Sequence, residues 1–167
     1  MSDSRDEDPA DPVLIVVPIL LSWTTSYFFG RTDPYKYTPA WFQPPGWVFG
    51  VVWTLLYVML GFLLYQSKRE KEYGVLTLVV VLLFFTYLWQ YLFNYRKMYR
   101  LAVYNLLVIL IISLILYVSL NYSDVVDRTT FGEGYLMVYV PFIAWIIFAI
   151  IMSVHTGYPK KYITRTI

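Results

Sequence analysis

The chain has 167 residues and a net charge of only +2, and apolar side chains dominate its composition. Apolar residues make up 59% of it and aromatic residues 20%, whereas charged residues make up 14%, well below the roughly 25% of an ordinary soluble domain. So few charges cannot cover the surface of a water-soluble globule. The absence of cysteine excludes disulfides, thiolate nucleophiles and thiolate metal sites.

Five long stretches of the chain are apolar throughout and contain no Asp, Glu, Lys, Arg or His. They cover residues 13–29, 47–66, 74–93, 101–120 and 135–154. A transmembrane helix needs roughly 20 mainly apolar residues, whereas a barrel strand alternates in polarity over about ten. We therefore predict an all-α membrane protein, a five-helix transmembrane bundle. The first helix follows Asp11 and Pro12, residues suited to cap a helix and to begin its first turn.

The charges are distributed unevenly between the two ends of these predicted helices. Eight basic and one acidic residue lie on the side of the C-terminus, against five basic and ten acidic residues on the other side. Because Lys and Arg favour the cytosolic side, we expect the N-terminus outside and the C-terminus in the cytosol. Residues 1–12 then form a disordered acidic tail, residues 13–157 one transmembrane domain, and residues 158–167 a basic cytosolic tail. The sequence leaves open whether the membrane is the mitochondrial outer membrane, a bacterial membrane or an endomembrane.

The connection at 30–46 is long and rich in aromatic residues and proline, and it reads GRTDPYKYTPAWFQPPG. Most loops in compact proteins have about 4–6 residues. One interpretation is a lid that covers the helix ends. The other is an interfacial loop whose Tyr and Trp side chains lie at headgroup depth.

Three predicted helices carry aromatic, small or polar residues at helical spacing. The helix at 47–66 has a stripe formed by Gly50, Trp53, Tyr57 and Gly61. The helix at 135–154 has a face formed by Pro141, Ala144, Trp145 and Phe148. The helix at 74–93 has a polar stripe formed by Thr86 and Gln90, with Trp89 beside it. An amide inside lipid is costly, so Gln90 either bonds to a neighbouring helix or faces a cavity.

Depth along the helices brings several of these residues to one level of the bilayer. The residues at that level are Trp23, Trp53, Trp89, Tyr104 and Asn105, with Trp145 nearer the midplane. Aromatic and polar groups at one depth suggest a pocket for a flat apolar ligand. The alternative is an aromatic core that packs the helices and binds no ligand.

One segment, WFQPPGWVFGVVWTLLYVMLG, resembles the signature P-P-x-W-x-F-G-x-V-W-T-x-L-Y-x-x-M-G of the translocator protein (tryptophan-rich sensory protein) family. The matching residues are Pro44, Pro45, Trp47, Phe49, Gly50, Val52, Trp53, Thr54, Leu56, Tyr57 and Gly61, with Met59 one residue before the usual Met. The family's helix-five pattern is similar to VPFIAWIIFA, and its helix-three pattern is similar to WQYLF. The resemblance covers nearly the whole chain.

The resemblance implies a five-helix bundle with a pocket near the cytosolic side, closed by the first loop. The family binds porphyrins such as protoporphyrin IX and haem, sterols, and synthetic benzodiazepine-site ligands, and some members are reported to degrade protoporphyrin in light. It implies that Trp53 and Trp145 are pocket tryptophans, and catalytic only if such photo-oxidation holds. The predicted ligand-binding residues are Trp41, Trp47, Gly50, Trp53, Tyr57, Thr86, Trp89, Gln90, Tyr104, Asn105, Pro141, Ala144, Trp145 and Phe148. A weak sterol motif is matched loosely by Val154, Tyr158 and Lys160.

The chain also departs from the family pattern at a few positions. Thr86 and Ser153 stand where the family often has asparagine, so two amides are lost. Leucines at 78 and 82 follow Gly74, in place of the Gly/Ala repeat linked to dimerisation in relatives. A homodimer is therefore left open.

Three functions remain open at this point. The first is a binding protein or carrier in the lipid membrane for tetrapyrroles and also sterols, in which porphyrin propionates meet Arg96, Lys97 or Arg100. The second is an enzyme that oxidises bound porphyrin in light. No inward carboxylate pair, activated nucleophile or metal cluster supports ordinary catalysis, so this is the enzymatic reaction that remains. The third is a structural or stress-sensing partner without a small ligand. We expect no required cofactor, no metal site and no nucleic-acid partner.

Overall fold

The computed structural model describes residues 11–29, 40–122 and 134–155, with side chains from residue 139 onward in the last range. The helices are α1 (Val13–Phe29), α2 (Gly46–Arg69), α3 (Tyr73–Gln90), α4 (Tyr99–Asn121) and α6 (Gly134–His155), and a short π-helix, η1 (Tyr91–Tyr95), extends α3. Strands do not occur among these residues. The stretch predicted at 74–93 thus corresponds to α3 and part of η1, a wide turn that the sequence pattern did not predict.

Three of the helices are long and apolar enough to cross a membrane. Their spans are Gly46–Arg69, Tyr73–Tyr95 and Tyr99–Asn121. Two shorter apolar helices, Val13–Phe29 and Tyr139–His155, accompany them. The chain is therefore an integral, multi-pass membrane protein.

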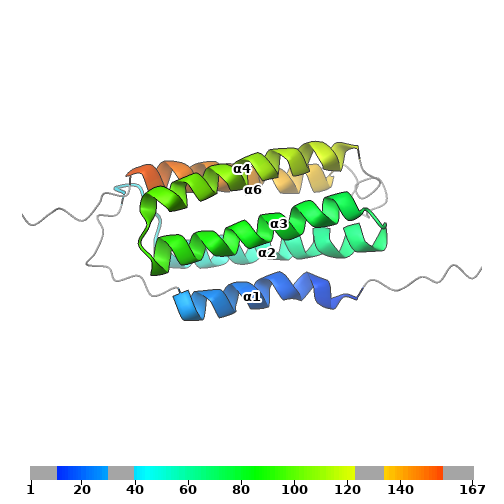
Figure 1. Cartoon of the computed structure of the whole chain (residues 1–167), viewed down its shortest axis with the longest axis horizontal. Coiled ribbons are helices and arrows are strands. Elements are labelled where there is room, and N and C mark those ends of the chain that lie inside the picture. Colours follow the sequence, from blue (N-terminus) through cyan, green and yellow to red (C-terminus); the bar gives the residue numbers. More distant parts are fainter. Residues whose placement is uncertain (1–10, 30–39, 123–133, 156–167) are drawn as a thin grey trace, which may run out of the picture.

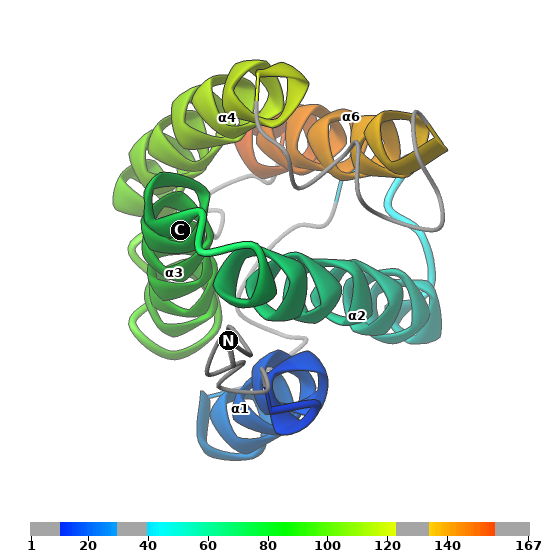
Figure 2. The ribbon, with the colours of Figure 1, turned by 90° about the vertical axis from the view of Figure 1, so that its right-hand side faces the viewer.

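The helices lie side by side along one long axis, in three tiers (Figure 1). Seen from the end, α1 lies on one side of the α2–α3 pair, and α4 and α6 lie on the other (Figure 2). The most extensive contacts join α1 to α2, α3 to α4, and α4 to α6, whereas α2 and α6 touch at few residues. The bundle is therefore tight between α1 and α2 and around α4, and loose along the seam between α2 and α6.

A close crossing fixes α1 against α2. A Cβ atom placed on Gly61 would collide with the backbone carbonyl group of Ile15 in α1. Small residues of this kind let two helix backbones approach closely in a membrane, where packing replaces the hydrophobic effect as the driving force. At the start of α1, the Asp11 carboxylate accepts a hydrogen bond from the Val13 amide at 2.9 Å, which confirms the expected cap.

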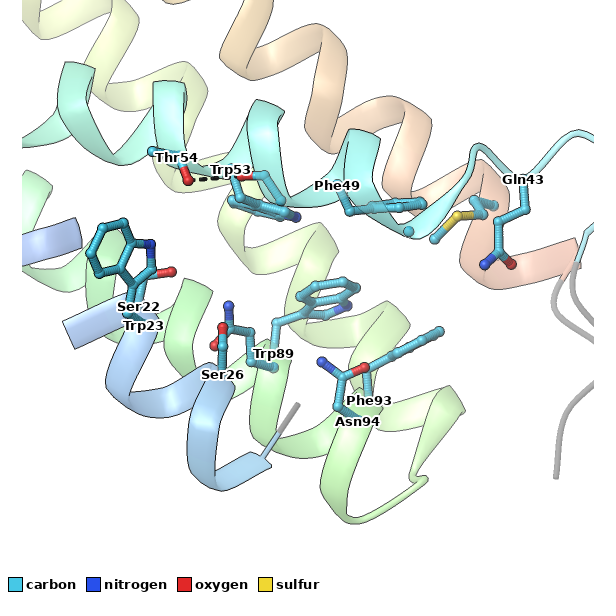
Figure 3. Close-up of a pocket in the computed structure, with 14 residues that line it drawn as sticks. Ser22, Trp23, Ser26, Gln43, Phe49, Trp53, Thr54, Trp89, Phe93 and Asn94 are labelled. Atoms are coloured by element: carbon cyan, nitrogen blue, oxygen red, sulfur yellow. Dashed lines mark hydrogen bonds between the residues drawn. The ribbon is translucent and has the colours of Figure 1, made fainter. Parts of the chain in front are cut away.

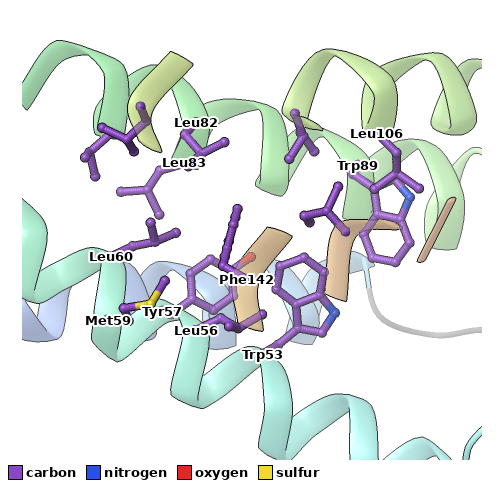
Figure 4. Close-up of a cluster of buried hydrophobic side chains, with 14 of the residues drawn as sticks. Trp53, Leu56, Tyr57, Met59, Leu60, Leu82, Leu83, Trp89, Leu106 and Phe142 are labelled. Atoms are coloured by element: carbon purple, nitrogen blue, oxygen red, sulfur yellow. The ribbon is translucent and has the colours of Figure 1, made fainter. Parts of the chain in front are cut away.

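The core consists mainly of leucine and aromatic side chains from α2, α3, α4 and α6 (Figure 4). Leu60, Leu82 and Leu106 are fully buried, as is Phe142 of α6. Hydrogen bonds from polar side chains also connect neighbouring helices. The Asn105 side chain donates to the Phe85 carbonyl at 2.9 Å, and the Tyr87 hydroxyl donates to the Pro18 carbonyl at 2.9 Å. These bonds join α4 to α3 and α3 to α1.

Candidate functional site

A cavity of about 460 Å³ lies where α1, α2 and the end of α3 meet. Gln43 and Gly46 border it at the start of α2, and Met152 borders it from α6. The lining residues are Ser22, Trp23, Ser26, Gln43, Gly46, Phe49, Gly50, Trp53, Thr54, Trp89, Gln90, Phe93, Asn94 and Met152. A space of this volume is within the range of small-molecule sites in proteins.

One wall of the cavity is a stack of aromatic rings from α2, α3 and η1. Trp89 lies between Phe93, at a ring-centroid distance of 5.2 Å, and Trp53, at 5.8 Å, with interplanar angles of 25° and 30°. The stack continues away from the cavity through Tyr57, which is 5.6 Å from Trp53, to Tyr87, which is 5.4 Å from Tyr57. The contacts of Trp53 with Trp89 and of Tyr57 with Tyr87 cross from α2 to α3, so the stack holds these helices together and makes this wall of the cavity apolar.

The opposite wall is polar and comes largely from α1. Ser22 and Ser26 lie across the cavity from Trp53 and Phe49 (Figure 3). Gln90 of α3 is 7% exposed, and the Thr25 hydroxyl oxygen lies 2.6 Å from its Oε1 atom. The Gln90 amide thus both bonds to a neighbouring helix and lines a cavity, so the two interpretations of its sequence position do not exclude each other.

A second hollow follows the loose seam between α2 and α6. It has a volume of about 560 Å³ and is lined by Pro44, Val52, Leu55, Leu56, Pro141, Ala144, Trp145 and Phe148. Every one of these side chains is apolar except for the indole N–H of Trp145, which is buried and has no hydrogen-bond partner among the described residues. We call this hollow the α2–α6 groove.

Phe49 lies between the cavity and the α2–α6 groove. Its ring lines the cavity and makes an edge contact with Trp145 at 5.5 Å and 63°. Trp145 in turn lines the groove, where Phe148 lies beside it at 5.2 Å. The two hollows thus lie on different faces of α2, and aromatic side chains lie between them near the start of that helix.

The structure divides the residues predicted from the sequence among several places. The cavity is lined by four of them: Gly50, Trp53, Trp89 and Gln90. Tyr57 and Thr86 are buried beside it, with 1% and 0% exposure, and the Thr86 hydroxyl donates to the Leu83 carbonyl. The groove is lined by four others: Pro141, Ala144, Trp145 and Phe148. Trp53 and Trp145, which the family resemblance pairs in one pocket, therefore line different hollows.

The other predicted residues face neither hollow. Trp41, Trp47 and Tyr104 are exposed, at 93%, 70% and 64%, and Asn105 is occupied by its bond to Phe85. In a membrane protein, exposed Trp and Tyr at helix ends suit the interface with lipid headgroups.

The part of the first loop that the structure describes packs on α6. Phe42 makes ring contacts with Phe148 at 6.2 Å and His155 at 5.5 Å. Gln43 reaches the cavity, but residues 30–39 lie outside the described residues, so the lid stays a prediction. Val154 is exposed near the end of α6, and the other two residues of the sterol motif, Tyr158 and Lys160, also lie outside the described residues.

On the α1 side of the cavity, the sequence predicted Trp23 at the depth of the pocket but did not predict the polar residues. Thr25 and Ser26 follow Ser22 by three and four residues, so the three side chains share one face of a mostly apolar helix. That spacing was a usable signal. Phe49 and Phe93 were also missed as site residues, although both belong to the quoted family patterns.

The lining residues limit the chemistry of the cavity. None of the fourteen is charged, and the described part of the chain contains no group of His, Cys, Asp or Glu residues that could hold a metal ion. Aromatic faces on one wall and uncharged hydrogen-bonding groups on the other suit binding of a flat ligand with a polar edge.

Fold and site together define a helical, multi-pass membrane protein with an aromatic, uncharged cavity near one end of the bundle. The model of the TspO/MBR family matches residues 14–158, most of the chain, and the protein therefore belongs to this family. No functionally curated protein matches the chain.

Proposed function

We propose that this protein is a membrane-embedded binding protein or carrier for tetrapyrroles such as protoporphyrin IX and haem, with all five helices crossing the bilayer and the C-terminal face in the cytosol. The observation that carries the proposal is the cavity wall formed by Trp53, Trp89 and Phe93. Membership of the TspO/MBR family supports a tetrapyrrole- or sterol-binding role in general.

The proposed pose places the porphyrin ring on the aromatic wall. A porphyrin ring offers two large π-faces, and offset contacts with indole and phenyl rings stabilise such a face by about 0.5–1.5 kcal/mol for each pair. The propionates then extend past Asn94 toward Arg96, Lys97 and Arg100, which lie a few residues further along the chain. Carboxylates bind guanidinium groups strongly and would not enter the uncharged cavity readily.

Two further roles follow from the same features. The α2–α6 groove is apolar and belongs to the membrane-embedded part of the bundle, so it suits a sterol better than a porphyrin. Light-driven oxidation of a bound porphyrin, with tryptophan as the electron donor, is the second candidate activity. Trp53 and Trp89 favour it, because they are stacked on each other within the cavity wall. In this structure Trp145, the other tryptophan implied by the resemblance, lines the groove.

The test is a titration of the detergent-solubilised full chain with protoporphyrin IX, followed by the porphyrin absorption band. We expect saturable binding in the micromolar range or below, weakened about tenfold when Trp53→Leu and Trp89→Leu remove two ring contacts. The control is Trp145→Leu, which changes the groove and should leave porphyrin affinity within about twofold. Non-saturating absorption changes, equal in all proteins, would mean partition of porphyrin into the micelle and would refute the proposal.

A further inference from the structure

We propose that Gln90, held in position by Thr25, is a hydrogen-bond donor that selects ligands with an uncharged carbonyl group on one edge. This inference rests on the proposed function, because it concerns the same cavity, and it narrows the class of ligand. It assigns a role to α1, whose polar side chains belong to none of the family patterns matched by this chain.

The Thr25 hydroxyl group fixes which end of the Gln90 amide faces the cavity. Its oxygen lies 2.6 Å from Gln90 Oε1 and 2.9 Å from the carbonyl oxygen of Ser22. A hydroxyl group has one proton to donate, and 2.6 Å is typical of an O–H···O bond but short for an N–H···O bond. The amide oxygen of Gln90 therefore faces Thr25, and its Nε2 group is turned the other way.

The free end of this amide belongs to the cavity. Gln90 lines the cavity, and Nε2 donates to no partner within the described residues. Next to Gln90 in the chain, the buried indole Nε1 of Trp89 also lacks a partner in that part of the chain. The indole Nε1 is enclosed by protein, so the Nε2 group of Gln90 is the donor left for a ligand in the cavity.

The acceptor that fits the Nε2 donor of Gln90 is uncharged. None of the cavity-lining residues is basic, so an ionised carboxylate at the depth of Gln90 would lack a counter-charge. The carbonyl oxygen of an ester, an amide or a lactam can accept the same hydrogen bonds without that cost. Ionised groups on the same ligand must instead lie nearer the cavity mouth.

The experiment compares two uncharged porphyrins, so that the basic residues outside the cavity contribute nothing. Protoporphyrin IX dimethyl ester has carbonyl acceptors, and etioporphyrin has alkyl groups in their place. For the wild-type full chain in detergent, we expect the ratio of the two dissociation constants to favour the ester by about fivefold, the effect of one good hydrogen bond. In Gln90→Leu and in Thr25→Val this preference should fall to within about twofold of unity, while etioporphyrin affinity stays constant.

Two further variants distinguish the positioning of Gln90 by Thr25 from a general disturbance of the cavity. Thr25→Ser keeps a hydroxyl group and should restore the preference for the ester. Thr24→Val makes the same change one residue earlier, where the hydroxyl is exposed and bonds to the Leu20 carbonyl of its own helix, so it should retain the wild-type ratio. Constant etioporphyrin affinity in every variant reports that the cavity remains folded.

The outcomes are distinguishable. An unchanged ratio in Gln90→Leu would overturn the role of Gln90 as a hydrogen-bond donor while leaving porphyrin binding in place. A ratio lost in Gln90→Leu but retained in Thr25→Val would overturn the positioning role of Thr25. If none of the porphyrins, including protoporphyrin IX, bound saturably to the wild-type chain, the proposed function would fail. The role of Gln90 in ligand selection would fail with it.

Discussion

The cavity and the α2–α6 groove share helix α2 but differ in almost every other respect. The cavity combines stacked tryptophans with hydroxyl and amide groups, and it is lined by α1 and α2, which cross closely at Gly61. The groove is apolar, and it lies where α2 and α6 hardly touch. One helix thus supplies an amphipathic site on one face and a lipid-like surface on another.

The difference shows what each hollow can hold. A cavity with an unused donor discriminates by hydrogen bonding, because an incorrect ligand leaves that donor unpaired. An apolar groove inside a membrane offers little selectivity, because lipid chains satisfy it equally well. Trp53 and Trp145 have the same side chain, yet we expect only the first to contribute to specific recognition of a porphyrin.

The largest expected effect comes from the crossing that supports the cavity. In Gly61→Leu the new side chain meets the Ile15 backbone, so α1 must move away from α2. We expect a loss of about 3 kcal/mol of stability, at the upper end for overpacking, with loss of porphyrin binding. Thermal unfolding in detergent measures it. Gly74→Leu is the control, because a Cβ atom placed there would meet no neighbouring group within 4 Å, and an equal loss there would contradict the explanation.

A second prediction concerns the access of water to the cavity and to the α2–α6 groove. The sequence contains no cysteine, so single introduced thiols can test it. Ser26→Cys places a thiol on the polar wall of the cavity, and Leu55→Cys places one in the groove. Only the thiolate form reacts, and lipid suppresses it. In native membranes we expect a water-soluble maleimide to label Cys at position 26 at least about tenfold faster.

Protoporphyrin IX provides the control for this labelling. Bound porphyrin should protect the position 26 thiol and leave the slow reaction at position 55 unchanged. Equal labelling rates at the two positions would show that both hollows are equally accessible to water. The proposed difference between a hydrated cavity and a lipid-filled groove would then be wrong.

The smallest expected effect tests the bonds that hold α1 to α3. Tyr87→Phe removes the hydroxyl that donates to the Pro18 carbonyl and keeps the ring that stacks on Tyr57. Interhelical hydrogen bonds in membranes contribute about 0.6 kcal/mol on average, so we expect a loss of that size in unfolding by SDS. Tyr104→Phe is the matched control, since Tyr104 is exposed and should show no loss. A similar loss in both variants would point to a general effect of the missing hydroxyl.

Some features of the fold could be predicted from the sequence, and others could not. Long uncharged apolar runs predict helices, because every backbone polar group in lipid must bond within its own segment. The π-helix at Tyr91–Tyr95 left no such signal, since a wider turn changes neither composition nor length. Helical spacing grouped Pro141, Ala144, Trp145 and Phe148 correctly on one face of α6, but it said nothing of which neighbour that face meets.

By itself, the sequence determined that the chain is a helical membrane protein with an aromatic family signature, because hydrophobic length and local spacing are properties of single segments. The tertiary structure alone decided how those segments combine. It placed Trp89 against Trp53, separated both from Trp145 by the ring of Phe49, and brought Thr25 to Gln90 across 65 residues of chain. Such pairings depend on the crossing of helices, which steric contact at residues such as Gly61 sets and which no single segment encodes.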